Sequence, residues 1–156
     1  MKKQVIEAIT SGLIGKWIHI DPKSALANLT PDNARIKNQN AAHSCWELLH
    51  HIVIWQDALL AQIKGASLDW NEIEKKDTWP TSESMQDDSN FSRLLNRFYS
   101  GMDEAQKLLK KVDFTSTYGH FPELSVIKLY LTLLQHTSYH LGQILTIRKI
   151  NGDKFI

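Results

Sequence analysis

The sequence is poor in the features that mark several large classes of protein. Its 156 residues include a single cysteine, Cys45, so no disulfide can form within the chain. This excludes the disulfide-stabilised scaffolds typical of small secreted proteins. Lys and Arg total 18 against 17 Asp and Glu, which leaves a formal net charge of +1. No basic block adds a local patch, so we expect no nucleic-acid partner recruited through bulk charge.

Long apolar runs are also missing. No stretch approaches the roughly 18 apolar residues of a membrane span, and Glu7 interrupts the N-terminal segment before an apolar stretch of signal-peptide length. Strand-like alternation and internal repeats are absent as well. The composition, 42% hydrophobic and 22% charged, is that of an ordinary globular protein. We therefore expect one soluble, cytoplasmic domain over residues 1–156, with no membrane partner.

Helical periodicity is what the sequence does contain. Apolar residues recur every three or four positions, as one face of a helix requires, in four segments: residues 5–20, 39–64, 84–111 (or 89–111) and 123–150. A short helical turn is expected at 24–29. Pro22 and Gly65 stand where the first and second segments should end. Four helices in one small domain predict an all-α four-helix bundle.

The connection between the second and third helices is unusually long. It runs over residues 66–83 and contains Trp70, Trp79 and Pro80, whereas bundle neighbours are usually joined by about 2 to 8 residues. At about 3.3 Å per extended residue, it can exceed the roughly 37 Å length of a 25-residue helix. The segment could therefore cross the bundle, so that these two helices run parallel, or it could cover a site.

Seven histidines are the most unusual feature of the composition. His136 and His140 are four residues apart, about 40° beyond one helical turn, so both leave the same side of the fourth helix. They share this side with apolar residues that should face the bundle interior: Leu129, Leu133, Ile144 and Ile147. A histidine placed there is costly unless both ring nitrogens are used. Two interpretations remain open, a hydrogen-bonded core pair or a pair of metal ligands.

The second helix offers a third histidine. His50 and His51 are adjacent, about 100° apart around the helix, so at most one of them can point inward. His51 lies about 100° from the centre of the apolar face and His50 about 160° from it, beside Asp57. We therefore predict that His51 joins His136 and His140, near the midpoints of their helices, and that His50 is a surface residue.

Three neutral imidazoles from two facing helices can hold Zn²⁺, Ni²⁺ or Fe²⁺ and leave positions open for water or substrate. Two neighbours could orient the rings: Glu47, one turn before His51, and Gln143, beside the histidine pair. The alternative for both is a solvated position at the rim. We expect the site to bind a divalent metal ion, with zinc and nickel as the preferred ions. Ligation by histidine alone suits both and does not distinguish between them.

Other metal and nucleophile motifs fail on specific residues. Glu47-x-x-His50 has the spacing of di-iron carboxylate bundles, but the second such pair and two further glutamates are missing. The zincin motif requires glutamate at the position of Thr137. Cys45 falls on the apolar side of its helix, where we expect a buried, unreactive thiol. No serine triad, phosphate loop or dinucleotide fingerprint occurs.

The remaining histidines are assigned no catalytic role. We expect His43 on the exposed side of the second helix. His19 stands near the end of an element, and His120 lies in the connector before Pro122. Polar positions in loops account for both.

Two motifs resemble those of a known family. The second helix carries Trp46-Glu47-Leu48-Leu49-His50-His51-Ile52-Val53-Ile54-Trp55, which resembles the second-helix signature of the DinB/YfiT-like superfamily. The fourth carries His136-x-x-Tyr139-His140-Leu141-Gly142-Gln143-Ile144, which is similar to that superfamily's fourth-helix signature, where both histidines bind metal. Gly15-Lys16-Trp17 and the long tryptophan-bearing loop extend the resemblance more loosely. The doubled histidine at 50 and 51 makes the correspondence ambiguous by one position.

The resemblance implies a four-helix bundle with a long crossover between helices two and three, a three-histidine metal site and frequent dimerisation. Members include S-transferases that use a low-molecular-weight thiol and a thiol-dependent maleylpyruvate isomerase. The leading hypothesis is therefore a divalent-metal-dependent enzyme with thiol-transfer or hydrolase chemistry on a small-molecule substrate, acting as a homodimer. The alternatives are a non-catalytic metal- or ligand-binding bundle and an interaction module without metal.

Overall fold

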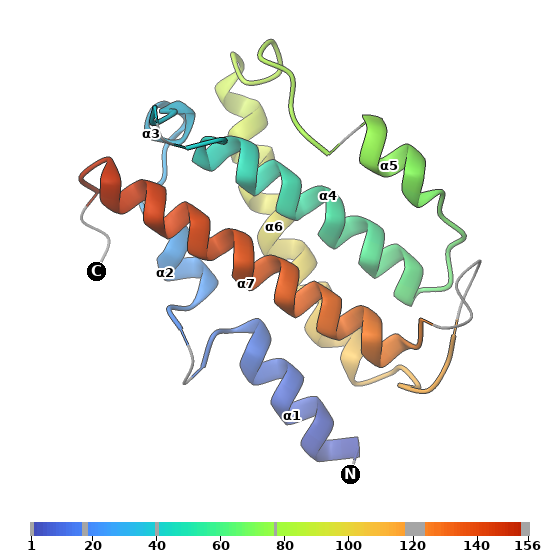
Figure 1. Ribbon diagram of the computed structural model, residues 1–156. Coiled ribbons are helices and arrows are strands. Elements are labelled where there is room, and N and C mark those ends of the chain that lie inside the picture. The colour runs from blue at the N-terminus through green and yellow to red at the C-terminus, as the bar shows by residue number, and fades with distance from the viewer. Residues whose placement is uncertain (1, 17–18, 40, 77, 118–123, 154–156) are drawn as a thin grey trace.

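The computed structural model of the protein describes residues 2–16, 19–39, 41–76, 78–117 and 124–153. Within these residues the chain forms helices and no strand apart from an isolated bridge between Thr117 and Ser125. The long helices are α1 (Lys2–Leu13), α4 (Cys45–Ile63), α6 (Asp88–Leu109) and α7 (Val126–Ile150) (Figure 1). The short ones are α2 (Pro22–Leu26), α3 (Pro31–Arg35) and α5 (Trp70–Lys76). The predicted all-α class is confirmed.

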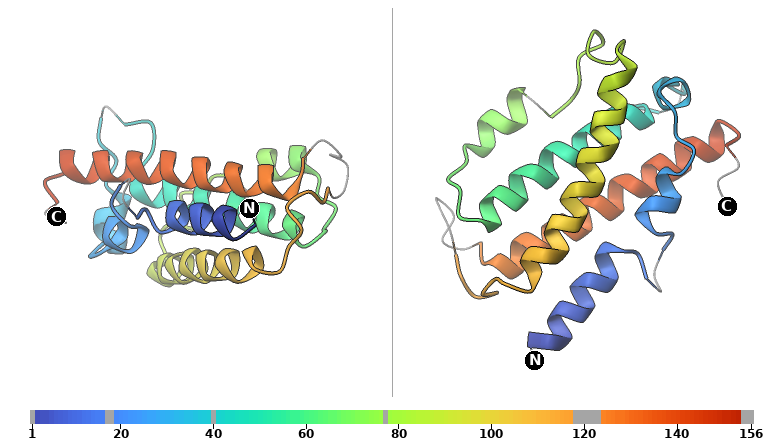
Figure 2. Two further views of the ribbon diagram at one scale, coloured as in Figure 1. Left: turned by 90° about the horizontal axis from the view of Figure 1, so that it is seen from below. Right: turned by 180° about the vertical axis from the view of Figure 1, so that it is seen from behind.

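The four long helices pack as a bundle. Helix α4 contacts both α6 and α7, and α1 packs against α6 and α7 on the other side. The views agree that α4 and α6 run in the same direction and that α7 runs in the opposite one (Figures 1 and 2). The connection from residue 64 to residue 87 therefore crosses the length of the bundle. This is the predicted long crossover.

Helix α4 begins at Cys45, later than the predicted start at residue 39. The reason is a capping box at Ser44. The Ser44 hydroxyl accepts from the Glu47 backbone N–H (3.2 Å), and the Glu47 carboxylate accepts from the Ser44 backbone N–H (2.6 Å). Two of the free N–H groups at the helix start are thereby satisfied.

Helix α1 ends at Leu13, so the helix predicted over 5–20 is too long; residues 17 and 18 of that range lie outside the described residues. Gly15 has a φ of +69°, which a right-handed helix does not allow. A Cβ atom at Gly15 would lie 2.9 Å from both the His19 ring and the Ile20 carbonyl oxygen. This glycine, seven residues before Pro22, is the signal that ends the helix.

Two capped short helices follow in place of the single turn predicted at 24–29. Asp21 caps α2 by accepting from the Ser24 backbone N–H, with Pro22 in the first turn. Thr30 and Asn33 form a capping box at α3. Buried Arg148 ties α7 to α2, donating to the carbonyl oxygens of Ala25 (2.6 Å) and Ala27 (2.7 Å).

The core lies where α4, α6 and α7 meet. Its largest fully buried side chains include Trp46, Phe91, Phe98, Leu49, Ile52 and Tyr130. The Tyr130 hydroxyl donates to the Ala105 carbonyl oxygen at 2.9 Å, so its polar end is satisfied inside the core. No helix within the described parts of the chain has the length and apolarity that crossing a bilayer requires.

Candidate metal centre

Three histidines from α4 and α7 converge near the middle of the bundle. His51, His136 and His140 each offer a ring nitrogen, and these nitrogens all lie within 4.8 Å of one another. The Nε2 atoms of His51 and His136 are 3.0 Å apart. The His140 ring centroid lies 4.6 Å from that of His51 and 4.5 Å from that of His136. The structure therefore brings together the three residues that the helical spacing selected.

The environment keeps these rings neutral. Burial lowers the pKa of His136 to about 3 and that of His51 to about 4, because a charged ring would lose its hydration there, and the neighbouring rings add repulsion. Burial also lowers the pKa of His140, against the opposing effect of its hydrogen bond with Gln143. A neutral imidazole keeps a lone pair available to a metal ion.

Gln143 orients one of the rings. Its Oε1 lies 2.6 Å from His140 Nδ1. An amide oxygen only accepts, so this contact assigns the hydrogen to Nδ1 and leaves the lone pair on Nε2 of His140. Of the two roles left open for Gln143, this geometry agrees with orientation of a ring, that of His140.

Glu47 was the other candidate for orienting the rings, and its side chain is used elsewhere. Its carboxylate caps the N-terminus of α4, as described above, and lies 3.6 Å from the Lys37 ammonium. The physical reason is the late start of α4. The third residue of a helix that begins at Cys45 is the one whose side chain can reach back to the cap.

An aromatic residue of the crossover lies against the histidines. The Trp79 ring stacks on His51, with centroids 4.4 Å apart and an interplanar angle of 13°. It also stacks on His43 at 3.8 Å and 4°. The expectation that His43 marks the exposed side of the second helix is therefore wrong: His43 precedes α4 and is half-buried.

Two further tryptophans, Trp55 and Trp70, form a stacked pair beside the histidine cluster. Trp70 of α5 stacks on Trp55 of α4, with ring centroids 5.7 Å apart and an angle of 9°. The Trp55 ring in turn lies 6.2 Å from that of His51 and 5.9 Å from that of His136. The crossover thus does both things that its length allowed, since it spans the bundle and covers the histidine cluster. The sequence showed the tryptophans, but not which rings they would contact.

The remaining candidates lie apart from this cluster. His50 lines a different hollow, beside Arg93 and Arg97 of α6. His19 is exposed, and its Nε2 lies 3.2 Å from the Ser138 hydroxyl. His120 falls outside the described residues. Burial raises the pKa of the Cys45 thiol to about 12, which agrees with the expected unreactive thiol.

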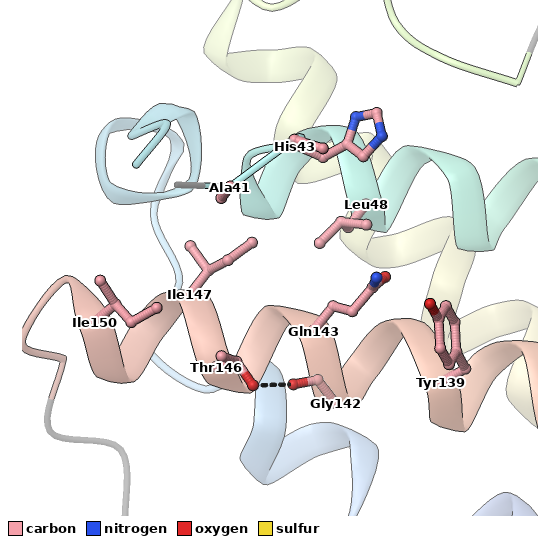
Figure 3. Close-up of a pocket in the computed structure, with 10 residues that line it drawn as sticks. Ala41, His43, Leu48, Tyr139, Gly142, Gln143, Thr146, Ile147 and Ile150 are labelled. Atoms are coloured by element: carbon pink, nitrogen blue, oxygen red, sulfur yellow. Dashed lines mark hydrogen bonds between the residues drawn. The ribbon is translucent and has the colours of Figure 1, made fainter. Parts of the chain in front are cut away.

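A pocket of about 390 Å³ adjoins Gln143, the residue that contacts His140, and none of the three clustered histidines is among the described residues that line it. Helix α7 lines one wall, and residues 41–43 with Leu48 line the other (Figure 3). Gln143 reaches from α7 toward the His43 side of this pocket, with Ile147 and Ile150 further along the helix (Figure 3). Gln143 therefore contacts His140 and also faces the pocket.

The three histidines could hold a divalent metal ion, and the distance between His51 and His136 can be compared with that expected for two ligands of one ion. Two nitrogens bound at about 2.1 Å to one ion stand roughly 3.0 to 3.4 Å apart, depending on the bond angle. The observed 3.0 Å between two Nε2 atoms lies in this range. Two neutral rings at that distance can share only one hydrogen bond. The other nitrogen of His51, Nδ1, is buried and makes no regular hydrogen bond. The nearby Thr78 backbone has a smaller effect, which is to raise the pKa of the His51 ring. The group could therefore hold a metal ion.

Comparison with known protein families shows which family the chain belongs to. The family model described as the DinB superfamily matches residues 23–144, most of the chain. The chain belongs to the DinB superfamily. No curated protein and no solved structure matches it significantly.

The DinB match covers α2 to α6 and most of α7, including all three histidines of the cluster. The motifs around His51 and around His136 and His140 therefore fall within the region that defines the superfamily. Residues 15–17, where the resemblance was looser, fall outside the match. The family match and the histidine cluster therefore lie in the same part of the chain.

Proposed function

We propose that this DinB-superfamily protein is a divalent-metal-dependent enzyme in which His51, His136 and His140 hold the ion. The observation that carries the proposal is the convergence of three neutral ring nitrogens from α4 and α7 beside an open pocket. Thiol transfer to an electrophile, or a hydrolysis, suits such a site. A small-molecule substrate and a low-molecular-weight thiol are the partners we propose.

The chain's own groups have separable roles. His51, His136 and His140 would hold the ion, which would supply Lewis acidity and so lower the pKa of a thiol or water near neutral pH. Gln143 holds the His140 ring in one tautomer through its 2.6 Å contact. Trp79 and Trp55 cover the rings with apolar surface and limit the access of water.

The identity of the ion follows from ligand chemistry. Three imidazoles without thiolate or carboxylate suit zinc and nickel. Cys45 does not join the group, because its thiol is buried and its Sγ lies 3.9 Å from the Ile144 carbonyl oxygen. We therefore propose zinc or nickel as the bound metal.

A non-catalytic metal- or ligand-binding bundle is the second candidate. The specific observation in its favour is the stacked cover of Trp79 and Trp55, which shields part of the cluster. The pocket beside Gln143 favours the enzyme, because it gives a substrate access to the neighbourhood of His140.

We also propose that the protein is a homodimer, as the superfamily resemblance implies. Leu131, an exposed apolar side chain on α7 outside the lining of the pocket beside Gln143, is available for such an interface. Light scattering should give twice the chain mass over a wide concentration range. A monomer at every concentration would reject the dimer without affecting the metal site.

Elemental analysis tests the proposal first. Protein purified without a histidine tag should carry about one zinc or nickel ion per chain. The loaded protein should then catalyse either ester hydrolysis or the displacement of chloride from a chloroarene by a small thiol, with release of chloride and a proton. The His136→Ala variant should lose both metal and activity. A loaded protein inactive on panels of both substrate types would favour the non-catalytic binder.

A further inference from the structure

The pocket beside the histidines has an uncharged lining. Among the described residues that line it there is no Asp, Glu, Lys or Arg, and the titratable side chains are those of His43, stacked on Trp79, and Tyr139. Ile147, Ile150 and Leu48 contribute apolar surface, and the Thr146 hydroxyl is already used, because it donates to the Gly142 carbonyl oxygen at 2.9 Å (Figure 3). Burying a charged ligand here without an opposite charge would cost several kcal/mol. The pocket therefore offers a charged ligand no permanently charged partner among these residues.

Gln143 supplies a hydrogen-bond donor in this setting. Its Oε1 is occupied by His140 Nδ1 at 2.6 Å, which turns the amide nitrogen away from that ring. The two amide hydrogens have no hydrogen-bond partner among the described residues, and the amide end reaches into the pocket (Figure 3). A side-chain amide has two donor hydrogens. A ligand with a carbonyl oxygen at this point would satisfy one of them.

We infer that the pocket binds an uncharged, mainly apolar small molecule whose carbonyl oxygen accepts a hydrogen bond from the Gln143 amide. The volume of about 390 Å³ lies within the size range of small-ligand sites. The inference rests on the proposed function in one respect, since the bound carbonyl compound would be the substrate that reacts beside His140. Recognition itself uses only groups of the protein.

Matched probes test the inference on metal-free protein. N-butylbenzamide is uncharged and has a carbonyl acceptor; 4-butylbenzoate has similar size and a negative charge; butylbenzene has no acceptor. Proton–nitrogen correlation spectra should show the benzamide shifting the Gln143 side-chain amide signals. Its affinity should exceed that of each control probe by about tenfold. Equal or tighter binding of the benzoate, or shifts confined to residues outside the pocket, would overturn the inference.

Two variants locate the binding. Gln143→Glu keeps an acceptor for His140 but removes both donor hydrogens and adds a charge, so benzamide affinity should fall at least tenfold. Thr146→Phe should occlude the pocket, whereas Lys149→Phe, on an exposed position of α7 outside the lining, should bind as the unaltered protein does. An unchanged melting temperature shows that each variant is folded. Unaltered affinity in both Gln143→Glu and Thr146→Phe would reject the assigned site.

The outcomes separate the inference from the proposed function. Metal-loaded protein that fails to bind the benzamide contradicts the inference alone. Benzamide binding by a protein that takes up no zinc or nickel contradicts the proposed function alone. Benzamide affinity that disappears as protein concentration rises would show a second copy of the chain covering the pocket, which also overturns the inference.

Discussion

Helix α4 packs against α6 on one side and against α7 on the other, and the residues at the two contacts differ in kind. Toward α6, aromatic rings fill the contact, as where Trp46 lies 4.9 Å from Phe91, and ion pairs such as Lys64–Glu104 stay at the exposed rim. Toward α7, the middle of the contact holds His51 and its two partner histidines. The α6 side is an ordinary helix contact. The α7 side places polar rings where packing alone would favour aliphatic ones.

Gln56 shows what an isolated buried polar residue looks like in the same helix. It is fully buried, and neither amide atom has a partner among the described residues. It lies against Gly101 of α6 and lines no described pocket. The histidines differ because three of them meet, a glutamine orients one, and a pocket opens beside them. Buried polarity alone does not mark a site, whereas convergent polarity beside a pocket does.

Acidification should affect the α7 side most. His51 and His136 have pKa values of about 4 and about 3 when folded, well below the unfolded value near 6.5. The stability that these neutral rings contribute is present above pH 6.5 and is lost as the pH falls toward the folded values. Each ring can cost at most about 1.4 kcal/mol per pH unit, less where water reaches it. Chemical denaturation of metal-free protein from pH 7 to pH 4 measures the loss, and His136→Gln should flatten the curve.

Metal removal should have the next largest effect. Protons compete with the ion for the same ring nitrogens, so the metal's contribution is present at pH 7.5 and diminishes as the pH falls. At free metal about a thousand times its dissociation constant, the contribution is roughly 4 kcal/mol, or something like 8 to 16 °C in melting temperature. Chelation should therefore lower the melting temperature visibly at pH 7.5 and much less at pH 5. An equal effect at both pH values would argue against histidine ligation.

Alanine substitutions at two glycines, one on α6 and one on α7, test how closely each helix is packed at that position. A Cβ atom at Gly101 would overlap with the end of the fully buried Gln56 side chain, which would have to shift, so Gly101→Ala should cost about 1 kcal/mol after the gain in helix propensity. A Cβ atom at Gly142 meets nothing within 4 Å, so Gly142→Ala should stabilise α7 by up to about 1 kcal/mol. Urea denaturation measures both. Equal effects of the two substitutions would contradict the close contact between α4 and α6.

The smallest expected effect concerns the aromatic cover. Trp79→Ala removes the ring stacked on His51 and lets water reach the imidazole, so the pKa of His51 should rise from about 4 toward its ordinary value. Histidine proton resonances followed through a pH titration measure this shift. Trp46→Phe, on the α6 side, is the matched control and should leave the His51 titration unchanged.

Much of the fold follows from local patterns in the sequence. Apolar spacing identified the four long helices, and proline and glycine marked some of their ends. The start of α4 was missed because the decision between residues 39 and 45 depends on the Ser44 cap. The same error misplaced His43 and left the capping role of Glu47 unrecognised. Helix α3 was missed because its capping box lies in a segment too short to show periodicity.

The candidate site was predictable where it depends on rotation around a helix. The 100° step between His50 and His51 was enough to choose between them, and the spacing of His136 and His140 placed both on one side. The contacts of Trp79 could not be predicted, because a loop residue has no periodicity and its neighbours depend on how the crossover folds. The pocket likewise depends on the position of residues 41–43 relative to α7.

Titration with zinc at pH 7.5 tests the central claim most directly. Calorimetry on metal-free protein should give one site per chain for the unaltered sequence and for His50→Ala. The same measurement should show severely weakened binding for His51→Ala, His136→Ala and His140→Ala, each still folded by circular dichroism. Tight binding retained by His51→Ala and lost by His50→Ala would contradict the assignment of the three-histidine site.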